Sequence, residues 1–155
     1  MTGTPGPAWT VRAFDDFPVR ELYEVLRLRS AVFVVEQQCL FEDMDGLDAR
    51  ALHLLGHGAD GQLLAYARCF DKGVAFAEAS IGRVITRTAT RGSGLGHRLI
   101  ARAIALVGER WGVQPIRIGA QARLRGFYEG HGFVDLRQPY VEDGIDHLEM
   151  LWQPE

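Results

Sequence analysis

The chain has 155 residues, of which 47% are hydrophobic and 24% are charged, and its formal net charge is -3. This length suffices for one domain with a sizeable core, and the composition is that of a globular protein. We therefore expect a single domain spanning residues 1–155. The small negative charge gives no general attraction to nucleic-acid phosphates or anionic lipid, so neither nucleic acid nor membrane is an expected partner.

The sequence offers no sign of export. Residues 1–10 lack a basic stretch followed by an apolar one, so a signal peptide is not expected. The densest apolar run, residues 31–35, is far too short to span a bilayer. One pair of cysteines, Cys39 and Cys69, hardly makes a secreted disulfide framework. We therefore expect two free thiols and a cytoplasmic protein.

The first half of the chain predicts strands around one helix and an acidic loop. Residues 9–14 predict a short strand. Apolar residues at helical spacing after Pro18 predict a helix whose pattern fades near Val35, with Arg29 extending its apolar stripe. Residues 36–50 are acidic and irregular, which indicates a loop. Further strands are predicted at 52–57, 62–70 and 79–86, the first two joined by the turn at 59–61.

The second half begins with a glycine-rich turn and a strong helix that ends at Trp111 and Gly112. Residues 115–121 predict a strand that is parallel to 79–86, because a crossover helix connects the two. A short helix at 122–130 and two final strands complete the predicted order. These strands are predicted at 133–140 and 147–152, around a turn at 142–144.

The glycine-rich turn, residues 91–96, reads Arg-Gly-Ser-Gly-Leu-Gly and directly precedes the helix. Glycines let the backbone turn sharply with its N–H groups pointing inward at the positive end of the helix dipole, which suits a phosphate. Arg91 adds a bidentate donor for phosphate oxygens. A Walker A loop is excluded because no Gly-Lys-Ser/Thr follows, and G-x-G-x-x-G fails because its third glycine falls on His97. The alternative is a tight turn that binds nothing.

The surroundings of this turn resemble the GNAT acyltransferases. Residues 91–96 match the R-x-x-G-x-G pyrophosphate motif of that superfamily, and the strand before it carries the expected Val-Ile-Thr at 84–86. Residues 127–133 match its later F-Y-x-x-x-G-F segment. The chain is most similar to the ElaA-like branch, through the segments at 28–39, 65–68, 81–86, 118–133 and 140–147.

The resemblance implies an α/β fold of the GNAT type, with a mixed, mostly antiparallel sheet of six to seven strands. A central parallel pair is splayed, and about four helices flank the sheet. The implied function is acetyl-CoA-dependent N-acetyl transfer, directly to a primary amine of a small molecule, polyamine or peptide. The alternatives are a non-catalytic sensor module that binds acyl-CoA, and an enzyme of this type with another acyl donor or aminoacyl transfer. Dimers are frequent in the family, so a homodimer is a candidate assembly.

Residue by residue, the resemblance implies where the coenzyme binds. Pantetheine would lie between the strands at 79–86 and 116–121, and the diphosphate would lie on the amides of residues 92–97 with Arg91 beside it. The residues implied in coenzyme binding are Val84, Ile85, Thr86, Arg91, Gly92, Ser93, Gly94, Leu95, Gly96, His97, Gln121, Phe127 and Tyr128.

The resemblance also implies two catalytic groups at the thioester. The Val84 N–H would stabilise the carbonyl oxygen as it gains charge, and Tyr128 would donate a proton to the leaving thiolate. A free tyrosine has a pKa of about 10 and a thiol of about 8.5, so complete proton transfer would be uphill by about 2 kcal/mol. Tyr128 would therefore hydrogen-bond the sulfur unless its surroundings lower its pKa. The alternative reading of Tyr128 is a packed aromatic residue beside Phe127.

The general base has several candidates. An ammonium acceptor must lose a proton, and His147 can accept one near neutral pH. Glu36 is the second candidate, with Glu142 and Glu78 as rivals. Many GNAT enzymes carry a glutamate on the strand before the glycine turn, but the aligned residue here is Ser80. For each carboxylate the alternative is a solvated surface charge.

The acidic loop suggests the nature of the acceptor. Asp43, Asp45 and Asp48 crowd the segment expected to border the acceptor pocket, which favours a cationic amine. Their spacing does not fit an EF-hand, because glycine stands at the fourth loop position and Leu54 at the twelfth. No metal is therefore expected. An ordinary acidic surface is the alternative to an acceptor wall.

Overall fold

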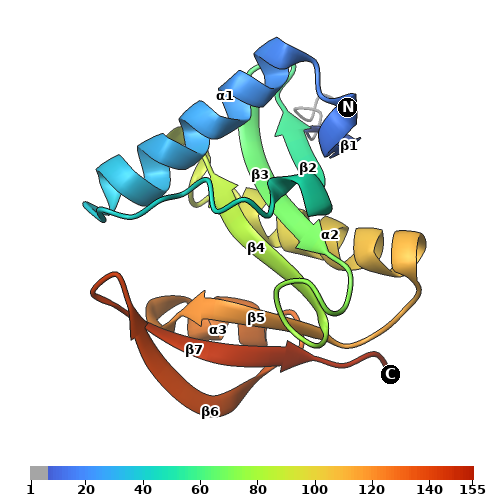
Figure 1. Ribbon diagram of the computed structural model, residues 1–155, viewed down its shortest axis with the longest axis vertical. Coiled ribbons are helices and arrows are strands. Elements are labelled where there is room, and N and C mark those ends of the chain that lie inside the picture. Colours follow the sequence, from blue (N-terminus) through green and yellow to red (C-terminus); the bar gives the residue numbers. More distant parts are fainter. Residues whose placement is uncertain (1–6) are drawn as a thin grey trace.

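The computed structural model describes residues 7–155, and within them seven strands form one sheet in the order β1-β2-β3-β4-β5-β7-β6 (Figure 1). Every adjacent pair is antiparallel except β4 and β5, which are parallel. The predicted mixed sheet with a central parallel pair is thus confirmed. The strands are β1 (Ala8–Ala13), β2 (Leu52–His57), β3 (Leu63–Phe70), β4 (Ala79–Thr86), β5 (Ile116–Gln121), β6 (Phe133–Glu142) and β7 (Ile145–Trp152).

Three α-helices flank the sheet in the described part of the chain. They are α1 (Val19–Arg29), α2 (Leu95–Trp111) and α3 (Arg125–Glu129), and a π-helical segment, Ser30–Glu36, continues α1. Figure 1 shows α1 in front of the sheet and α2 behind it. Side chains alternate accordingly along β2, because Leu54 belongs to the core under α2 while Leu55 belongs to the core under α1.

Two boundaries differ from the sequence prediction. Strands β6 and β7 extend to Glu142 and from Ile145, beyond the predicted limits at residues 140 and 147. The reason is the connecting turn, in which Asp143 and Gly144 both have positive φ, at 51° and 74°. Such a two-residue turn keeps the strands paired up to its ends. In addition, the π-helical segment prolongs the first helix to the start of the acidic loop.

A buried arginine fixes the acidic loop to α1. Arg29 is fully buried, and its Nε and Nη1 donate to Asp43 (3.0 Å) and Asp48 (2.7 Å). Its Nη2 also donates to the carbonyl oxygen of Asp43 (3.1 Å). Arg29 therefore extends the apolar stripe of the helix as predicted, but its charge is neutralised by two carboxylates of residues 37–50.

Two arginines of the sheet complete this network. Arg68 on β3 donates to Asp45 and to Asp48 (3.0 Å), and Arg83 on β4 donates from Nε to Asp43 (2.8 Å). Burial alone would raise the pKa of Asp48, but its arginine partners lower it below its usual range. Against the effect of burial, arginine partners lower the pKa of Asp45 as well, so Asp45 and Asp48 are ionised. The ion pairs of the three aspartates hold residues 43–48 on the α1 face of the sheet.

His53 lies beneath this network. It is fully buried, with Nε2 2.9 Å from the carbonyl oxygen of Asp48 and Nδ1 2.6 Å from the hydroxyl of Tyr66. Because a carbonyl can only accept, Nε2 carries the proton, and Nδ1 accepts from the tyrosine hydroxyl. Burial lowers the pKa of His53, so the ring is neutral in the folded protein.

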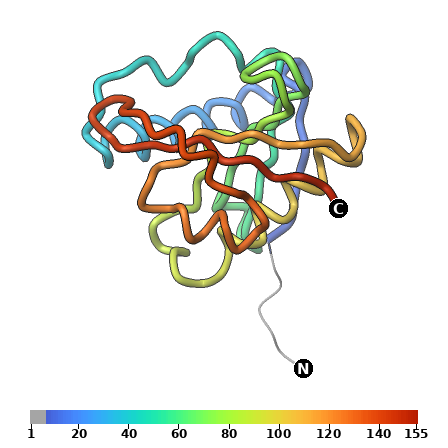
Figure 2. The backbone as a smooth tube through the Cα atoms, turned by 90° about the horizontal axis from the view of Figure 1, so that it is seen from below, coloured from blue at the N-terminus to red at the C-terminus, as the bar shows by residue number. Residues whose placement is uncertain are grey.

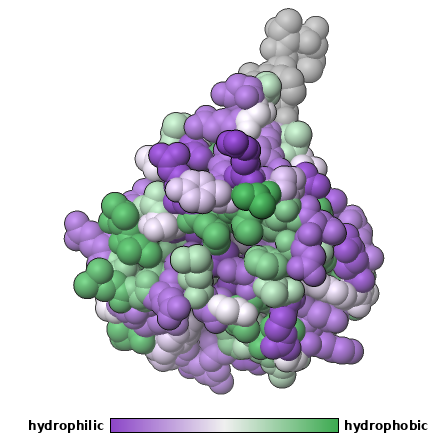
Figure 3. All heavy atoms as spheres, turned by 45° about the horizontal axis from the view of Figure 1, so that its top comes forward, coloured by the Kyte–Doolittle hydropathy of each residue, from purple (hydrophilic) through white to green (hydrophobic). Residues whose placement is uncertain are grey.

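On the face shown in Figure 3, apolar side chains appear in groups among hydrophilic ones. The most exposed large apolar side chain of the described residues, Leu40, belongs to the loop after the π-helical segment. In residues 7–155 no helix has both the length and the apolar character needed to cross a bilayer.

The ionic network yields a stability prediction. Replacing Arg29 by methionine should lower the free energy of unfolding by about 3 kcal/mol, since one partner of a buried ion pair is removed and the other is left unpaired. Urea unfolding measures this difference. Arg27→Met, an exposed site on the same helix, is the matched control and should change stability by less than about 0.5 kcal/mol. Equal stability of the two variants would contradict the role given to Arg29.

His53 yields a pH prediction. Its pKa is lowered in the folded state, so the unfolded chain binds a proton more readily. Stability should therefore be complete above the ordinary histidine pKa of about 6.5 and should decline as the pH falls below it. Urea midpoints measured between pH 8 and pH 5 test this, with His53→Phe as the variant that lacks the decline. A wild-type midpoint that rises on acidification would refute it.

Candidate active site

Strands β4 and β5 separate after only two paired residues. Ala79 pairs with Ile116 and Ser80 with Arg117, and the described chain has no further pairing between these strands. Beyond this point β4 runs alongside β3 and β5 alongside β7, and the two strands diverge toward their C-terminal ends (Figure 1). Each strand thus turns an unpaired backbone edge toward the other over its C-terminal part.

A bulge interrupts β4 beside this divergence. In the pairing of β4 with β3, Gly82 lies opposite Arg68 and Ile85 lies opposite Tyr66. Arg83 and Val84, between them, therefore have no paired residue in β3. Arg83 has a φ of 48°, which a side chain other than glycine rarely adopts. Its guanidinium, bonded to Asp43, also lies over the rings of Phe33 (5.8 Å) and Phe41 (5.5 Å).

The glycine-rich turn has the open form that the sequence predicts. Gly92 and Gly94 have φ of 88° and 83°, and a Cβ at either would meet no atom within 4 Å. Helix α2 begins at Leu95 without a side-chain cap, and the first bond back to the turn comes from the N–H of Arg98 to the oxygen of Gly94. The N–H groups of residues 95–97 are therefore the open donors at the start of the helix.

One amide of the turn is not available. The N–H of Ser93 donates to the carbonyl oxygen of Thr90 (3.2 Å), and the Ser93 hydroxyl also donates to this oxygen. The Ser93 N–H thus has an acceptor inside the turn, and the assignment of the diphosphate to the amides of residues 92–97 stays a prediction. The Ser93 donor closes the turn internally, which holds the two glycines in their left-handed conformation.

Arg91 is paired with Glu36. Its Nη2 and Nη1 lie 3.0 and 3.3 Å from the glutamate carboxylate, and Thr88 also donates to Glu36 (3.2 Å). The hydrogen bond from Arg91 lowers the pKa of Glu36. A carboxylate held in this way is a weaker proton acceptor, and Arg91 must leave it to bind a phosphate.

Helix α3 places Phe127 and Tyr128 beside the turn. A Cβ at Gly96 would lie 3.5 Å from the Phe127 ring, an ordinary van der Waals distance, so Phe127 lies next to the first turn of α2. Tyr128 is buried, and its ring packs edge-on against Phe127 (5.1 Å) and Phe133 (5.7 Å). Burial raises the pKa of Tyr128 to about 12. The phenol therefore keeps its proton at neutral pH.

His147 lies on β7 opposite Gln121, at the C-terminal end of β5. Its Nδ1 is 2.8 Å from the carbonyl oxygen of Ile145, and its ring stacks on Tyr140 (5.2 Å). Since the carbonyl can only accept, Nδ1 carries the proton of the neutral ring and Nε2 is left as the basic nitrogen. His147 also lines a hollow of about 370 Å³ on the β6–β7 hairpin.

Some of the remaining predicted site residues can face a ligand only with their backbone atoms, and others can also do so with their side chains. The side chains of Ile85 and Leu95 are buried in the two cores, so only their backbone atoms can face a ligand. Thr86 ends β4 and is half-buried. Gln121 donates from Nε2 to Gln37 (3.2 Å), which links β5 to the loop that follows the π-helical segment.

The rival base Glu78 is engaged elsewhere. Both of its carboxylate oxygens accept from Arg117, each at 2.9 Å, and this bond lowers the pKa of Glu78. Ser80, at the position where many relatives in the superfamily place a glutamate, is buried. Glu142 lies exposed at the end of β6. Of the candidates, His147 alone combines a fixed orientation with a basic atom that none of the described residues holds in a hydrogen bond.

The aspartates of the acidic loop are paired with arginines. Asp43, Asp45 and Asp48 all form ion pairs with arginine side chains, and of the three only Asp45 is exposed. The preference for a cationic acceptor stays a prediction. Sequence reasoning missed these partners, although an arginine in an apolar stripe was the available signal. The loop does reach the β6–β7 hairpin, because the Cys39 thiol donates to the carbonyl oxygen of Asp143 (3.5 Å), and the two segments lie side by side in Figure 2.

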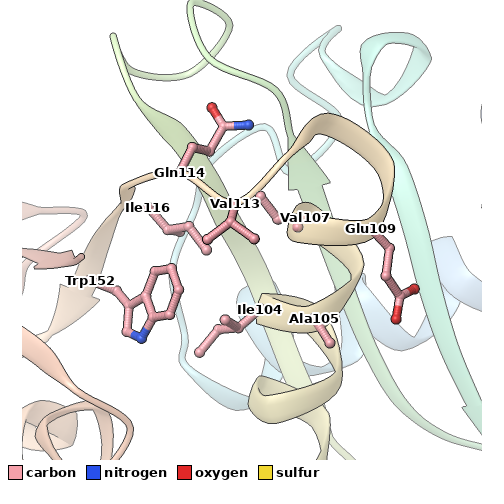
Figure 4. A pocket seen from close by; sticks show the side chains of 9 residues that line it. Ile104, Ala105, Val107, Glu109, Val113, Gln114, Ile116 and Trp152 are labelled. Carbon is pink, nitrogen blue, oxygen red and sulfur yellow. The ribbon is translucent and has the colours of Figure 1, made fainter. Parts of the chain in front are cut away.

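A second pocket lies at the far end of α2 (Figure 4). Its volume is about 400 Å³, and its walls are mainly apolar. The amide of Gln114 at its rim already donates to the carbonyls of Trp111 and Gly112. From Leu95 to Glu109 the helix rises about 20 Å, so this pocket is remote from the glycine turn. Its apolar lining residues include Ile104, Val107, Val113, Ile116 and Trp152.

Known proteins share this architecture. The family model described as an acetyltransferase (GNAT) domain matches residues 22–154. The crystal structure of an acyl-CoA N-acyltransferase from Pseudomonas aeruginosa has a TM-score of 0.88 at 41% identity, over 94% of this chain and 99% of that chain. ElaA of Escherichia coli is 39% identical over 92% of this chain and 94% of its own, and its crystal structure has a TM-score of 0.87. A UPF0039 protein of Synechocystis is 40% identical over 94% of each chain.

The fold and the family model together identify a GNAT acetyltransferase domain. The chain belongs to the GNAT acetyltransferase family, and its similarity to ElaA extends over most of its length.

Proposed function

We propose that the protein is an N-acetyltransferase that moves an acetyl group from acetyl-CoA directly to a primary amine of a small molecule, polyamine or peptide. The observation that carries the proposal is the divergence of β4 and β5 beside the glycine-rich turn. An extended ligand that carries amide groups, as pantetheine does, can pair with a free strand edge in the manner of an added strand.

The residues of the turn fit the other end of such a ligand. Gly92 and Gly94 leave the turn without side chains, and the amides of residues 95–97 stand at the positive end of α2. Arg91 supplies a guanidinium once it leaves Glu36. Thr86 and Gln121 lie at the ends of the two diverging strands and would flank the pantetheine arm.

Acetyl-CoA supplies an activated thioester, and the chain supplies the groups around it. Val84 lies in the bulge of β4 without a partner in β3, and we assign its N–H to the thioester carbonyl oxygen. Such a donor matters most as the oxygen gains negative charge, and losing one typically costs about 3 kcal/mol of barrier lowering. The Asp43–Arg83 contact holds the bulge in place.

Tyr128 is assigned to the sulfur. With a pKa of about 12 it is a weaker acid than a thiol, whose pKa is about 8.5, so complete proton transfer would be uphill by about 5 kcal/mol. Tyr128 therefore stabilises the leaving thiolate by donating a hydrogen bond and keeps its proton. Its burial excludes water, which strengthens that bond.

His147 is the base that the arrangement favours. Its Nε2 is free to accept the proton of the attacking ammonium, directly or through water, while Glu36 is weakened as a base by Arg91. We also propose that residues 1–155 form a single domain and that the protein is a homodimer.

The experiment that tests the function is a thiol-release assay with acetyl-CoA and a panel of primary amines. Turnover with at least one amine supports the transferase. Tight binding of acetyl-CoA without turnover on any amine supports instead the sensor module that binds acyl-CoA. Turnover with a longer acyl-CoA in place of acetyl-CoA would change the donor and keep the roles assigned at the thioester. Transfer from an aminoacyl donor, measured by product formation because no thiol is released, would replace the thioester chemistry.

The Arg91–Glu36 pair gives a prediction for affinity. Replacing Glu36 by glutamine frees Arg91 and should tighten coenzyme A binding about two- to five-fold, the range of an exposed ion pair. Calorimetry measures this change. Glu42→Gln, an exposed carboxylate in the same region, should leave the affinity unchanged. Weaker binding by Glu36→Gln would show that Arg91 is not the phosphate ligand.

Tyr128 gives a prediction for turnover. Tyr128→Phe should slow acetyl transfer about ten- to a hundred-fold, because the thiolate loses its hydrogen bond while the packing of the ring is retained. Its Kd for coenzyme A should stay within about two-fold, since the phenol is assigned only to the sulfur. The control is Tyr23→Phe on the exposed face of α1. An unchanged kcat would remove Tyr128 from the mechanism.

A further inference from the structure

Two histidines form a hydrogen-bonded pair at the start of α2. Nδ1 of His97 lies 2.8 Å from Nε2 of His131, which follows α3. Both rings also pack on Phe127, with centroids 4.7 Å and 5.4 Å from it, and they lie 5.0 Å from one another. His97 is exposed and His131 half-buried, so the pair is open to a ligand.

The position of the pair follows from its neighbours. His97 is the third residue of α2, and its backbone amide is among the open donors at the helix start. Phe127 joins the pair to Tyr128, whose ring lies 5.1 Å from that of Phe127. The aromatic row therefore runs from the residue assigned to the sulfur toward the turn assigned to the diphosphate. The histidines lie at the outer end of this row, beside the turn that the proposed function assigns to the diphosphate.

The short contact between the rings limits their protonation. One proton lies between the two nitrogens, so one ring donates and the other accepts. If both rings were cationic, two N–H groups would face each other and the bond would be lost. Burial and the nearby His97 ring lower the pKa of His131. The pair therefore holds at most one added proton, and a neighbouring anion would favour its uptake.

The charged groups on the surrounding elements do not favour protonation of the histidine pair before a ligand binds. On α3 and β6, Arg125 lies 3.6 Å from Glu129 and 3.7 Å from Asp135, so those carboxylates already have a cationic partner. Arg91 on the turn faces Glu36. Arg98, the next residue of α2, adds a positive charge and opposes protonation of the free pair. A phosphate would reverse this balance.

We propose that the His97–His131 pair is a phosphate contact that takes up one proton when the nucleotide portion of coenzyme A binds. The neutral pair becomes an imidazolium hydrogen-bonded to an imidazole, and the cationic ring donates to a phosphate oxygen. Affinity for coenzyme A then rises as the pH falls from 8 to 6. This inference rests on the proposed function, in which the turn binds the diphosphate.

Calorimetry in buffers of different ionisation enthalpy tests the proposal, because it counts the protons taken up with the ligand. Near pH 7 the wild type should take up more protons per coenzyme A than His97→Gln or His131→Gln. Its affinity should also increase roughly three- to ten-fold from pH 8 to pH 6, beyond the change seen in the variants. His57→Gln, on β2, is the control and should behave as the wild type. Dephospho-coenzyme A distinguishes the two phosphate sources: retained proton uptake assigns the diphosphate, and its loss assigns the 3′-phosphate.

Two outcomes have separate meanings. Equal proton uptake and equal pH dependence in the wild type and both variants, with coenzyme A bound, would overturn this inference and leave the proposed function standing. Absence of coenzyme A binding at any pH would overturn the proposed function itself. The histidine ring resonances of the wild-type protein provide a second readout, since the pair should titrate at higher pH once coenzyme A is added.

Discussion

The structure depends on the early separation of β4 and β5. Two parallel strands that begin side by side would normally continue to pair, and here they stop after Ser80 and Arg117. Strand β7 occupies the other edge of β5, and β3 occupies the other edge of β4. Unpaired backbone edges of β4 and β5 therefore face the gap between the diverging strands. The glycine-rich turn follows β4 after one short 3-10 turn, Thr88–Thr90, so only a few residues separate the strand edge from the open helix start.

The bulge beside this separation contains an unfavourable backbone conformation, and contacts of other residues stabilise it. The left-handed backbone of Arg83 is unfavourable for a side chain, by about 1–3 kcal/mol for such sites in general. Its guanidinium is held by Asp43, which Arg29 also holds from the opposite side. The acidic loop thus stabilises the bulge of β4. Its three aspartates are all paired with arginines, so Glu142 and other exposed carboxylates near the β6–β7 hairpin are the unpaired charges of the described chain that a cationic amine could meet.

The element order and the glycine-rich turn could be predicted because both depend on local sequence. Apolar periodicity places α2 and the strands, and only glycine accepts the left-handed backbone at residues 92 and 94 without strain. The partners of Asp43 and Asp45 could not be predicted in the same way. Their strand partners Arg68 and Arg83 lie 23 and 40 residues away, and an acidic loop has the same sequence pattern whether its charges face water or arginines. The amide of Ser93 was missed for a related reason, since the sequence does not show which donors of a turn close it internally.

The residues that distinguish an enzyme from a binding module are not the residues that determine the fold. The glycine-rich turn and the diverging strands would serve a sensor of acyl-CoA equally well, and packing against Phe127 and Phe133 alone accounts for a buried aromatic ring at Tyr128. His147 is harder to explain by packing. The carbonyl of Ile145 fixes its protonated nitrogen and leaves the basic one free, beside the residue that ends β5. A module that only bound the coenzyme would have no use for an oriented base, whereas a transferase acting on an ammonium requires one.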